Sequence, residues 1–324
     1  MSTRLHFYFY IFIDILIIAI YNINMIILYT HLFLMGEYYM NRTTLFSHIS
    51  GKWLVFLGAL FWSLNAPLIK YLTINPLLIC GLRALIAGIV LSPFIRLKKF
   101  RFTPWLITYM ISYSTLCIGI VIALQYTSAP IAIGMQYSSI IWIFIVHAII
   151  SKKFSFKNFS PVFLIILGVF CFMLSGFQDG TSFGNLIALT EGISFALMTV
   201  SFQKSSIENP IGITAMANLF CSFFVFLCCP KIINDITLIS ISEWLILLLL
   251  GIVQVGLGYT FYNLGIQKTS AQSAAIISLW EMILGPVWIA IFYHEYPSAL
   301  VFSGFVIILC GMLFHVYLEN KKTS

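Results

Sequence analysis

The chain has 324 residues, of which 61% are hydrophobic and only 8% are charged, whereas soluble domains carry about 25% charged residues. This composition excludes a water-soluble globule, and it predicts a membrane protein because each spanning helix needs about 20 mostly apolar residues. The net charge of +7 does not indicate nucleic-acid binding, since the basic residues lie in short loops between apolar runs, where Lys and Arg set membrane orientation.

Apolar runs bounded by charged residues, Pro, Gly and Asn predict ten spanning helices and no soluble domain. The predicted spans are residues 53–72, 76–95, 104–125, 129–150, 159–177, 183–203, 210–231, 243–265, 271–292 and 298–318. The predicted fold is an all-α, polytopic membrane protein. We divide it into a first five-helix unit, residues 51–178, and a second, residues 179–324.

The N-terminal extension, residues 1–50, has no counterpart in the second half of the chain. Residues 7–35 are apolar and aromatic enough to span a membrane, but polar residues interrupt the run. Three interpretations are open: an extra N-terminal apolar helix, a signal-like segment without a convincing cleavage site, or a mis-assigned start, with translation beginning at Met40.

The two predicted units repeat each other. Asn75-Pro76 recurs as Asn209-Pro210, and Thr127-Ser128-Ala129 recurs as Thr269-Ser270-Ala271. Because each unit has an odd number of spans, the second enters the membrane from the opposite side, and we expect inverted repeats. Repeats of this kind are typical of carriers that hold a substrate at the interface of their two halves, near the middle of the bilayer.

The basic residues predict the orientation. Arg42 and Lys52 precede the first span, basic residues between 96 and 101 follow the second, and Lys321 and Lys322 follow the tenth. All fall on one side, which the positive-inside rule assigns to the cytoplasm. Both ends of the ten-helix body are therefore expected to be cytoplasmic, in a bacterial-type cytoplasmic membrane.

Ionisable residues inside predicted spans are the first candidates for function, because each costs about 2.5 to 3.5 kcal/mol at a helix centre. Four qualify: Arg83, His147, Glu191 and Glu281. Arg83 could bind a substrate carboxylate or phosphate, or pair with an internal carboxylate. Glu281 could bind a substrate ammonium, carry a proton or serve stability alone; Glu191 could be a second acidic site group. His147 lies at a span end and fits an interfacial residue better than a proton relay.

Further candidates are polar or aromatic residues placed deeper than the usual interfacial belts. As substrate-binding residues we predict, beside Arg83, Glu191 and Glu281, a set of seven: Trp62, Asn65, Gln136, Tyr259, Tyr262, Asn263 and Trp280. Gln254 is a further polar candidate in the eighth span. Pro286 removes a hydrogen bond to the Met282 carbonyl, so a kink or a freed acceptor is expected there.

Two stretches resemble a known family. The first half carries 62–65 (Trp-Ser-Leu-Asn), Lys70 and Leu82-Arg83; the second carries 278–281 (Ser-Leu-Trp-Glu), Glu295, Gly304 and Gly311. Over residues 52–318 the chain resembles EamA-type carriers of the drug/metabolite transporter superfamily. The resemblance implies ten helices in two inverted five-helix repeats, a cavity lined by the first four helices of each, and a fifth helix for packing or dimer contacts.

The sequence departs from that family pattern in both halves. The family's glutamate is followed directly by proline, but Met282 follows Glu281 here, and Pro286 comes later. Ser139 and Lys153 stand where the two glutamates of the first repeat would fall. Only Glu281 can therefore be carried over from the family, as the candidate proton-coupling group.

The expected function is secondary transport of small organic metabolites, such as amino acids or related compounds, by alternating access, with proton coupling or exchange. A narrower alternative is uptake of a host nucleoside-like or methyl-donor metabolite. An alternative of another class is a polytopic enzyme acting on lipids, but no enzyme motif is present. No cofactor or metal is expected, because the seven cysteines show no metal spacing. Expected partners are a small-molecule substrate, membrane lipids and a second copy in a homodimer.

Overall fold

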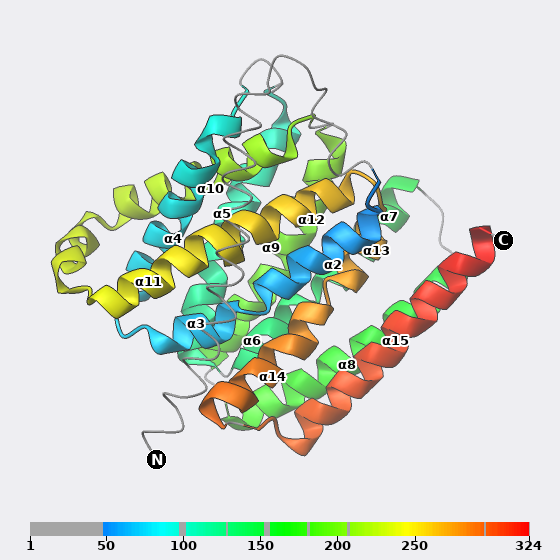
Figure 1. Ribbon diagram of the computed structural model, residues 1–324. Coiled ribbons are helices and arrows are strands. Elements are labelled where there is room, and N and C mark those ends of the chain that lie inside the picture. The colour runs from blue at the N-terminus through cyan, green and yellow to red at the C-terminus, as the bar shows by residue number, and fades with distance from the viewer. Residues whose placement is uncertain are drawn as a thin grey trace.

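The computed structural model describes residues 48–96, 102–127, 129–151, 156–179, 182–205, 208–294 and 296–323, and every regular element in these ranges is a helix (Figure 1). Among the described residues, seven helical stretches are long and apolar enough to cross a membrane: Gly51–Tyr71, Pro76–Phe94, Pro104–Tyr126, Phe183–Lys204, Pro210–Cys228, Ile241–Ile266 and Ala271–Tyr293. Shorter apolar stretches are Ile131–Val146, Phe159–Cys171 and Ala299–Gly311. Residues 1–47 of the predicted N-terminal extension lie outside the described residues.

The helices of the first half coincide with the predicted spans within a few residues. They are α2 (Gly51–Trp62), α3 (Asn65–Tyr71), α4 (Pro76–Leu91), η1 (Ser92–Phe94), α5 (Pro104–Tyr126), α6 (Ala129–Gln136), α7 (Ser139–Ser151) and α8 (Phe156–Asp179). The second half contains α9 (Ser182–Lys204), α10 (Pro210–Cys228), η3 (Pro230–Leu238), α11 (Ile241–Leu249), η4 (Leu250–Leu257), α12 (Gly258–Ile266), α13 (Ala271–Ile277), α14 (Trp280–Tyr293) and α15 (Ala299–Thr323).

The repeated Asn-Pro pair marks two equivalent helix starts. The Asn75 side chain accepts a hydrogen bond from the Leu77 amide at the start of α4, and Asn209 accepts one from the Gly212 amide at the start of α10. Asn is a favoured N-cap, and Pro fits the first helical position because its missing N–H has no partner there. Asn209 also donates from Nδ2 to the Phe94 carbonyl at 2.7 Å, which ties the start of α10 to the end of η1.

The long helices pack in pairs that join the two halves. Helix α4 packs against α10, α8 against α15, α2 against α12, and α5 against α9. Figure 1 shows α8 and α15 side by side at one edge, and α2 alongside α12. Two of these pairs, α4–α10 and α8–α15, join helices at equivalent positions of the two halves. In the other two, α2–α12 and α5–α9, the first long helix of one half packs against the third of the other.

Four glycines let α2 and α12 approach closely, and we call this contact the glycine seam: Gly51 and Gly58 on α2, Gly258 and Gly265 on α12. A Cβ on Gly58 would lie 2.9 Å from the Gly258 carbonyl oxygen, and a Cβ on Gly51 would lie 2.8 Å from that of Gly265. Small residues permit such backbone contact between membrane helices. The seam fixes the first span of one half against the third span of the other.

Three of the predicted spans are interrupted, which the sequence analysis did not predict. The interruptions fall at Ser63–Leu64 between α2 and α3, at 137–138 between α6 and α7, and at Ser278–Leu279 between α13 and α14. The Ser63 and Ser278 hydroxyls donate to carbonyls three residues earlier, at 2.7 and 2.8 Å. A serine side chain that hydrogen-bonds to the local backbone competes with the backbone hydrogen bonds of the helix.

Helix α14 continues through Pro286, and the kink or freed acceptor expected there stays a prediction. The interruption of this span lies at Ser278–Leu279, just before Trp280 and Glu281. A further irregularity is η4, a π-helical stretch in the eighth predicted span. Such widened turns are rare and are frequent at functional sites.

Glu243 holds the start of α11 against the loop that follows α3. Its carboxylate accepts from the Ser240 amide at 3.0 Å, in a capping box, and from the Thr73 hydroxyl at 2.9 Å. We expect Glu243→Ala to lower the free energy of unfolding by about 1–3 kcal/mol, because a helix cap and charge-assisted hydrogen bonds are lost. Thermal unfolding of the purified protein measures this. Glu208→Ala, which removes an exposed carboxylate, is the control; equal effects of both variants would contradict the role of Glu243.

Candidate functional site

Arg83 lies in the middle of α4 and is only 2% exposed. Its Nη1 donates to Asn65 Oδ1 at 2.7 Å, and its Nη2 donates to the Cys117 carbonyl oxygen at 2.9 Å. Both acceptors are neutral, and the guanidinium forms no ion pair within the described part of the chain. A buried cation without an anion is costly, and a negatively charged group beside this guanidinium would offset that cost.

Asn65 stands at the first position of α3, directly after the interruption at Ser63–Leu64. The interruption aims its side chain at α4, where the amide oxygen accepts from Arg83. The α2–α3 break and the Arg83 guanidinium are therefore parts of one arrangement, which the family resemblance of 62–65 and Leu82-Arg83 did not by itself reveal.

Glu281 lies in the first turn of α14, directly after the break between α13 and α14, and is 3% exposed. Its Oε2 is 2.6 Å from the hydroxyl of Tyr137, which lies in the break between α6 and α7. The same hydroxyl donates to the Ser278 carbonyl oxygen at 2.5 Å. Breaks in both halves thus meet at one carboxyl group.

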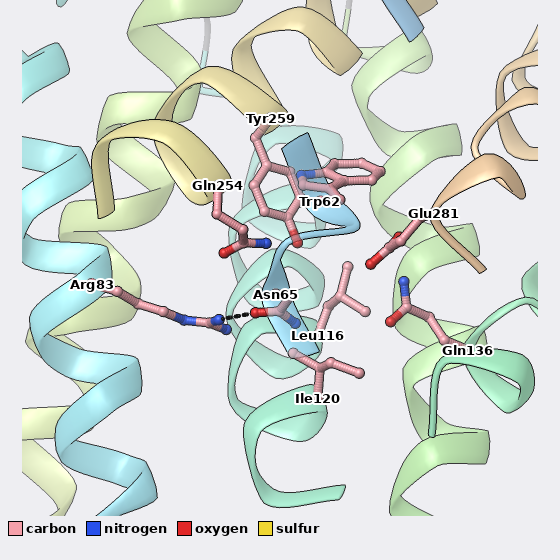
Figure 2. A pocket seen from close by; sticks show the side chains of 9 residues that line it. All are labelled: Trp62, Asn65, Arg83, Leu116, Ile120, Gln136, Gln254, Tyr259 and Glu281. Carbon is pink, nitrogen blue, oxygen red and sulfur yellow. Dashed lines mark hydrogen bonds between the residues drawn. The ribbon is translucent and has the colours of Figure 1, made fainter. Parts of the chain in front are cut away.

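These groups line a small cavity at the centre of the helix bundle (Figure 2). Its lining residues are Trp62, Asn65, Arg83, Leu116, Ile120, Gln136, Gln254, Tyr259 and Glu281. The space left is about 10 Å³, enough for about one water molecule. A space of this size holds nothing larger than water in this conformation, so a larger ligand can enter only after the helices around it move.

Six of the ten predicted site residues are brought together here, and they come from both halves. Figure 2 shows Arg83 and Asn65 on one side of the cavity and Glu281 and Gln136 pointing toward each other on another. The predicted members of the lining are Trp62, Asn65, Arg83, Gln136, Tyr259 and Glu281. An amide, a cation and a carboxyl group therefore surround one small space.

Aromatic rings form one wall of the cavity. The ring centroids of Trp62 and Tyr259 are 4.6 Å apart, within the range of favourable aromatic pairs. Trp62 Nε1 has no hydrogen-bond partner among the described residues, and neither has Gln254 Oε1. Buried polar atoms normally have partners, so both are unsatisfied in this conformation; Trp62 Nε1 packs against Gly258 on α12.

The other four predicted site residues are buried or half-buried outside the lining. Tyr262 shares a hydrogen bond with the Thr199 hydroxyl at 2.8 Å. Asn263 donates from Nδ2 to the hydroxyls of Tyr109 and Thr214, at 2.8 and 2.9 Å. These contacts join α12 to neighbouring helices.

Trp280 and Glu191 also lie outside the lining. Trp280 is half-buried and meets the Phe56 ring edge-on, with centroids 5.6 Å apart. Glu191, on α9, is 1% exposed, and neither carboxyl oxygen has a hydrogen-bond partner among the described residues. Space for it exists because a Cβ on Gly119 would lie 2.9 Å from its Cγ.

The sequence analysis missed two lining residues, Leu116 and Ile120 on α5. They are four residues apart and so share a helix face, but nothing distinguishes them from other apolar residues of the span. Tyr137 was also missed. Its only signal was an aromatic residue one position after the candidate Gln136.

Some predicted features lie outside the description. The side chain of His147 is not described, and Lys153 and Glu295 lie outside the described residues. Within the described ranges no group of three or more His, Cys, Asp or Glu side chains is arranged to hold a metal ion.

Apolar helices around an enclosed polar site define a multi-pass membrane protein of the transporter class. The chain matches the model of the EamA-like transporter family over residues 49–174 and again over residues 182–317. It therefore belongs to this family, within the drug/metabolite transporter superfamily.

Comparison with individual proteins adds the fold alone. A search of the curated proteins finds no match. One crystal structure superposes with a TM-score of 0.65 at 18% sequence identity, covering 85% of this chain and 99% of that one. At this identity the likeness supports the arrangement of the helices but gives no information about a substrate.

Proposed function

We propose that this protein is a secondary transporter that moves a small organic metabolite across the membrane by alternating access. The observation that carries the proposal is the convergence of Arg83, Asn65 and Gln136 from the first half with Gln254 and Glu281 from the second on one central cavity. A closed cavity between two repeats is where such carriers hold their substrate. A non-transporting scaffold needs no such buried polar space.

We further propose ten spans in two inverted five-helix repeats, residues 51–178 and 179–324. Helix pairing supports this: α4 packs against α10 and α8 against α15, while α2–α12 and α5–α9 are exchanged pairs. A two-fold relation between the repeats produces this pattern, and an odd number of spans per repeat makes it inverted. Three of the ten spans would be the shorter apolar stretches in α6–α7, α8 and α15.

The substrate we favour is an amino acid or a related compound with a negatively charged group. Arg83, which has only neutral partners, would bind that group, and Trp62 and Tyr259 would cover its apolar part. Gln136 and Glu281 would meet a polar or ammonium group at the opposite side of the cavity. We propose that this occurs in a bacterial-type cytoplasmic membrane with both ends of the ten-helix body cytoplasmic.

Contacts with the surroundings follow from exposed apolar side chains. Phe163, Leu167 and Phe170 on α8 are exposed, as are Phe302 and Val306 on α15. We propose that lipid tails cover these surfaces, or that a second copy of the chain covers the α8–α15 edge in a homodimer.

The decisive experiment is flux of labelled metabolites into vesicles of both orientations, with and without a protonophore. We expect at least one anionic or zwitterionic compound to accumulate in a protonophore-sensitive way, and Glu281→Gln to lose that sensitivity. Flux no faster than in protein-free liposomes for the whole panel would contradict transport. Proton-dependent flux that is unchanged in the variant would remove Glu281 from coupling.

A further inference from the structure

The Tyr137 hydroxyl makes two short contacts that a single proton cannot serve. Its oxygen lies 2.5 Å from the Ser278 carbonyl oxygen and 2.6 Å from Glu281 Oε2. The Tyr137 side chain is fully buried, and the packing around it holds the ring in place. Both distances are at the short end for O–H···O hydrogen bonds, so each contact requires a proton between its two oxygens.

Counting donors decides where the second proton must be. A phenol has one proton, a carbonyl has none, and an ionised carboxylate only accepts. If Tyr137 donates to an ionised Glu281, then its oxygen faces the Ser278 carbonyl oxygen at 2.5 Å with no proton between them, which is repulsive. If Tyr137 donates to Ser278, then the proton in the other contact must come from the carboxyl group of Glu281.

We propose that Glu281 carries a proton in this conformation, donates it to the Tyr137 oxygen, and that Tyr137 donates in turn to the Ser278 carbonyl. We call these three residues the proton clasp. Tyr137 is then a positioning residue that holds the protonated carboxyl group in place. The role of the clasp in transport rests on the proposed function, whereas its protonation state does not.

The clasp joins equivalent interruptions in the two repeats. Tyr137 lies between α6 and α7, and Ser278 lies between α13 and α14. By the offset that relates Thr127 to Thr269, Tyr137 corresponds to Leu279, so the two breaks match to within one residue. When the proton leaves, one of the two short contacts must lengthen. Deprotonation therefore loosens the contact between the repeats beside the cavity.

Charged and titratable groups from the neighbouring helices face Glu281. They are Tyr137 between α6 and α7, Arg83 on α4, Tyr259 on α12 and Glu191 on α9. Lys70 on α3, which also packs against α14, is exposed and lies at the other end of α14, with its ammonium 5.0 Å from the centre of the Tyr293 ring.

Infrared spectroscopy of the purified protein in lipid nanodiscs at neutral pH tests the protonation state. We expect a C=O stretching band of a protonated carboxyl group that disappears in Glu281→Gln and persists in Glu191→Gln, the matched change at the other buried carboxyl. A carboxyl region that is the same in Glu281→Gln and the wild type would overturn the proposal.

A second variant tests the partner of the proton. In Tyr137→Phe the acid loses its acceptor, so the Glu281 band should move to higher frequency. Tyr113→Phe is the matched control, because the Tyr113 hydroxyl is buried and has no hydrogen-bond partner among the described residues. In this variant the Glu281 band should keep its wild-type frequency. An unshifted band in Tyr137→Phe would overturn the clasp.

The spectra are recorded without substrate, so the proton clasp and the transport function can be contradicted independently of each other. The expected bands in a protein that moves no metabolite would contradict the transport function and leave the protonated clasp intact. Transport without these bands would contradict the clasp alone. If both hold, Tyr137→Phe should lose accumulation driven by a pH gradient while keeping exchange of substrate across the membrane.

Discussion

Replacing Asn65 with aspartate should reduce transport about 10-fold or more without unfolding the protein. The Asn65 oxygen already lies 2.7 Å from Arg83 Nη1, so a carboxylate at this position would pair with the guanidinium and compete with the proposed substrate anion. Charged hydrogen bonds contribute about 1.5–3 kcal/mol, which corresponds to about 10- to 150-fold in apparent affinity. Initial rates of flux in vesicles, over a range of substrate concentrations, measure this.

The direction of this effect separates two roles of Arg83. If Arg83 served only stability, an internal anion would strengthen its pairing, and transport would be unchanged while the melting temperature rose. If Arg83 binds substrate, the melting temperature holds or rises while transport falls. Arg83→Lys is the companion variant: it keeps the charge but cannot bind both Asn65 and the Cys117 carbonyl in the same fork geometry, so we expect partial transport. Full activity of both variants would exclude Arg83 from the binding site.

Replacing Gly58 with alanine should destabilise the protein by about 1–3 kcal/mol, the usual cost of overpacking. A Cβ there would meet the Gly258 carbonyl oxygen at 2.9 Å and the Tyr262 amide nitrogen at 3.0 Å. Both are backbone atoms, so neither can move aside without shifting α12. Thermal unfolding and size-exclusion profiles of the detergent-solubilised protein measure the loss.

The same substitution at Gly285 is the matched control. There the nearest atom to a new Cβ is the end of the Ile133 side chain, at 3.1 Å, which can rotate away. Alanine also has a better helix propensity than glycine, by about 1 kcal/mol, so Gly285→Ala should be neutral or stabilising. Equal destabilisation by both variants would show that the glycine seam is not a special contact.

Apolar runs and their boundaries allowed the helices to be predicted from sequence, because in a membrane every backbone group must be satisfied within its own helix. The cost of burying ionisable groups likewise identified Arg83 and Glu281, which the structure places at one cavity. These predictions depend on local composition alone, which is why they needed no knowledge of packing.

What escaped prediction depends on contacts between distant segments. Asn263 and Asn65 are both amides in apolar spans, yet Asn263 bonds to Tyr109 and Thr214, whereas Asn65 bonds to Arg83 at the cavity. Their position in apolar spans does not separate the two, since the difference is which helix lies opposite. The same holds for Tyr137, whose partner Glu281 is in the other half of the chain.

The glycine seam changes which parts of the molecule should move together. Backbone contact at Gly51–Gly265 and Gly58–Gly258 leaves little room for α2 and α12 to separate, although they belong to different halves of the sequence. Helices α5 and α9 form the equivalent pair on the other side of the repeat. We therefore expect each rigid body of the proposed transport cycle to contain helices of both repeats. The groups of helices that move together would then differ from the two repeats of the sequence.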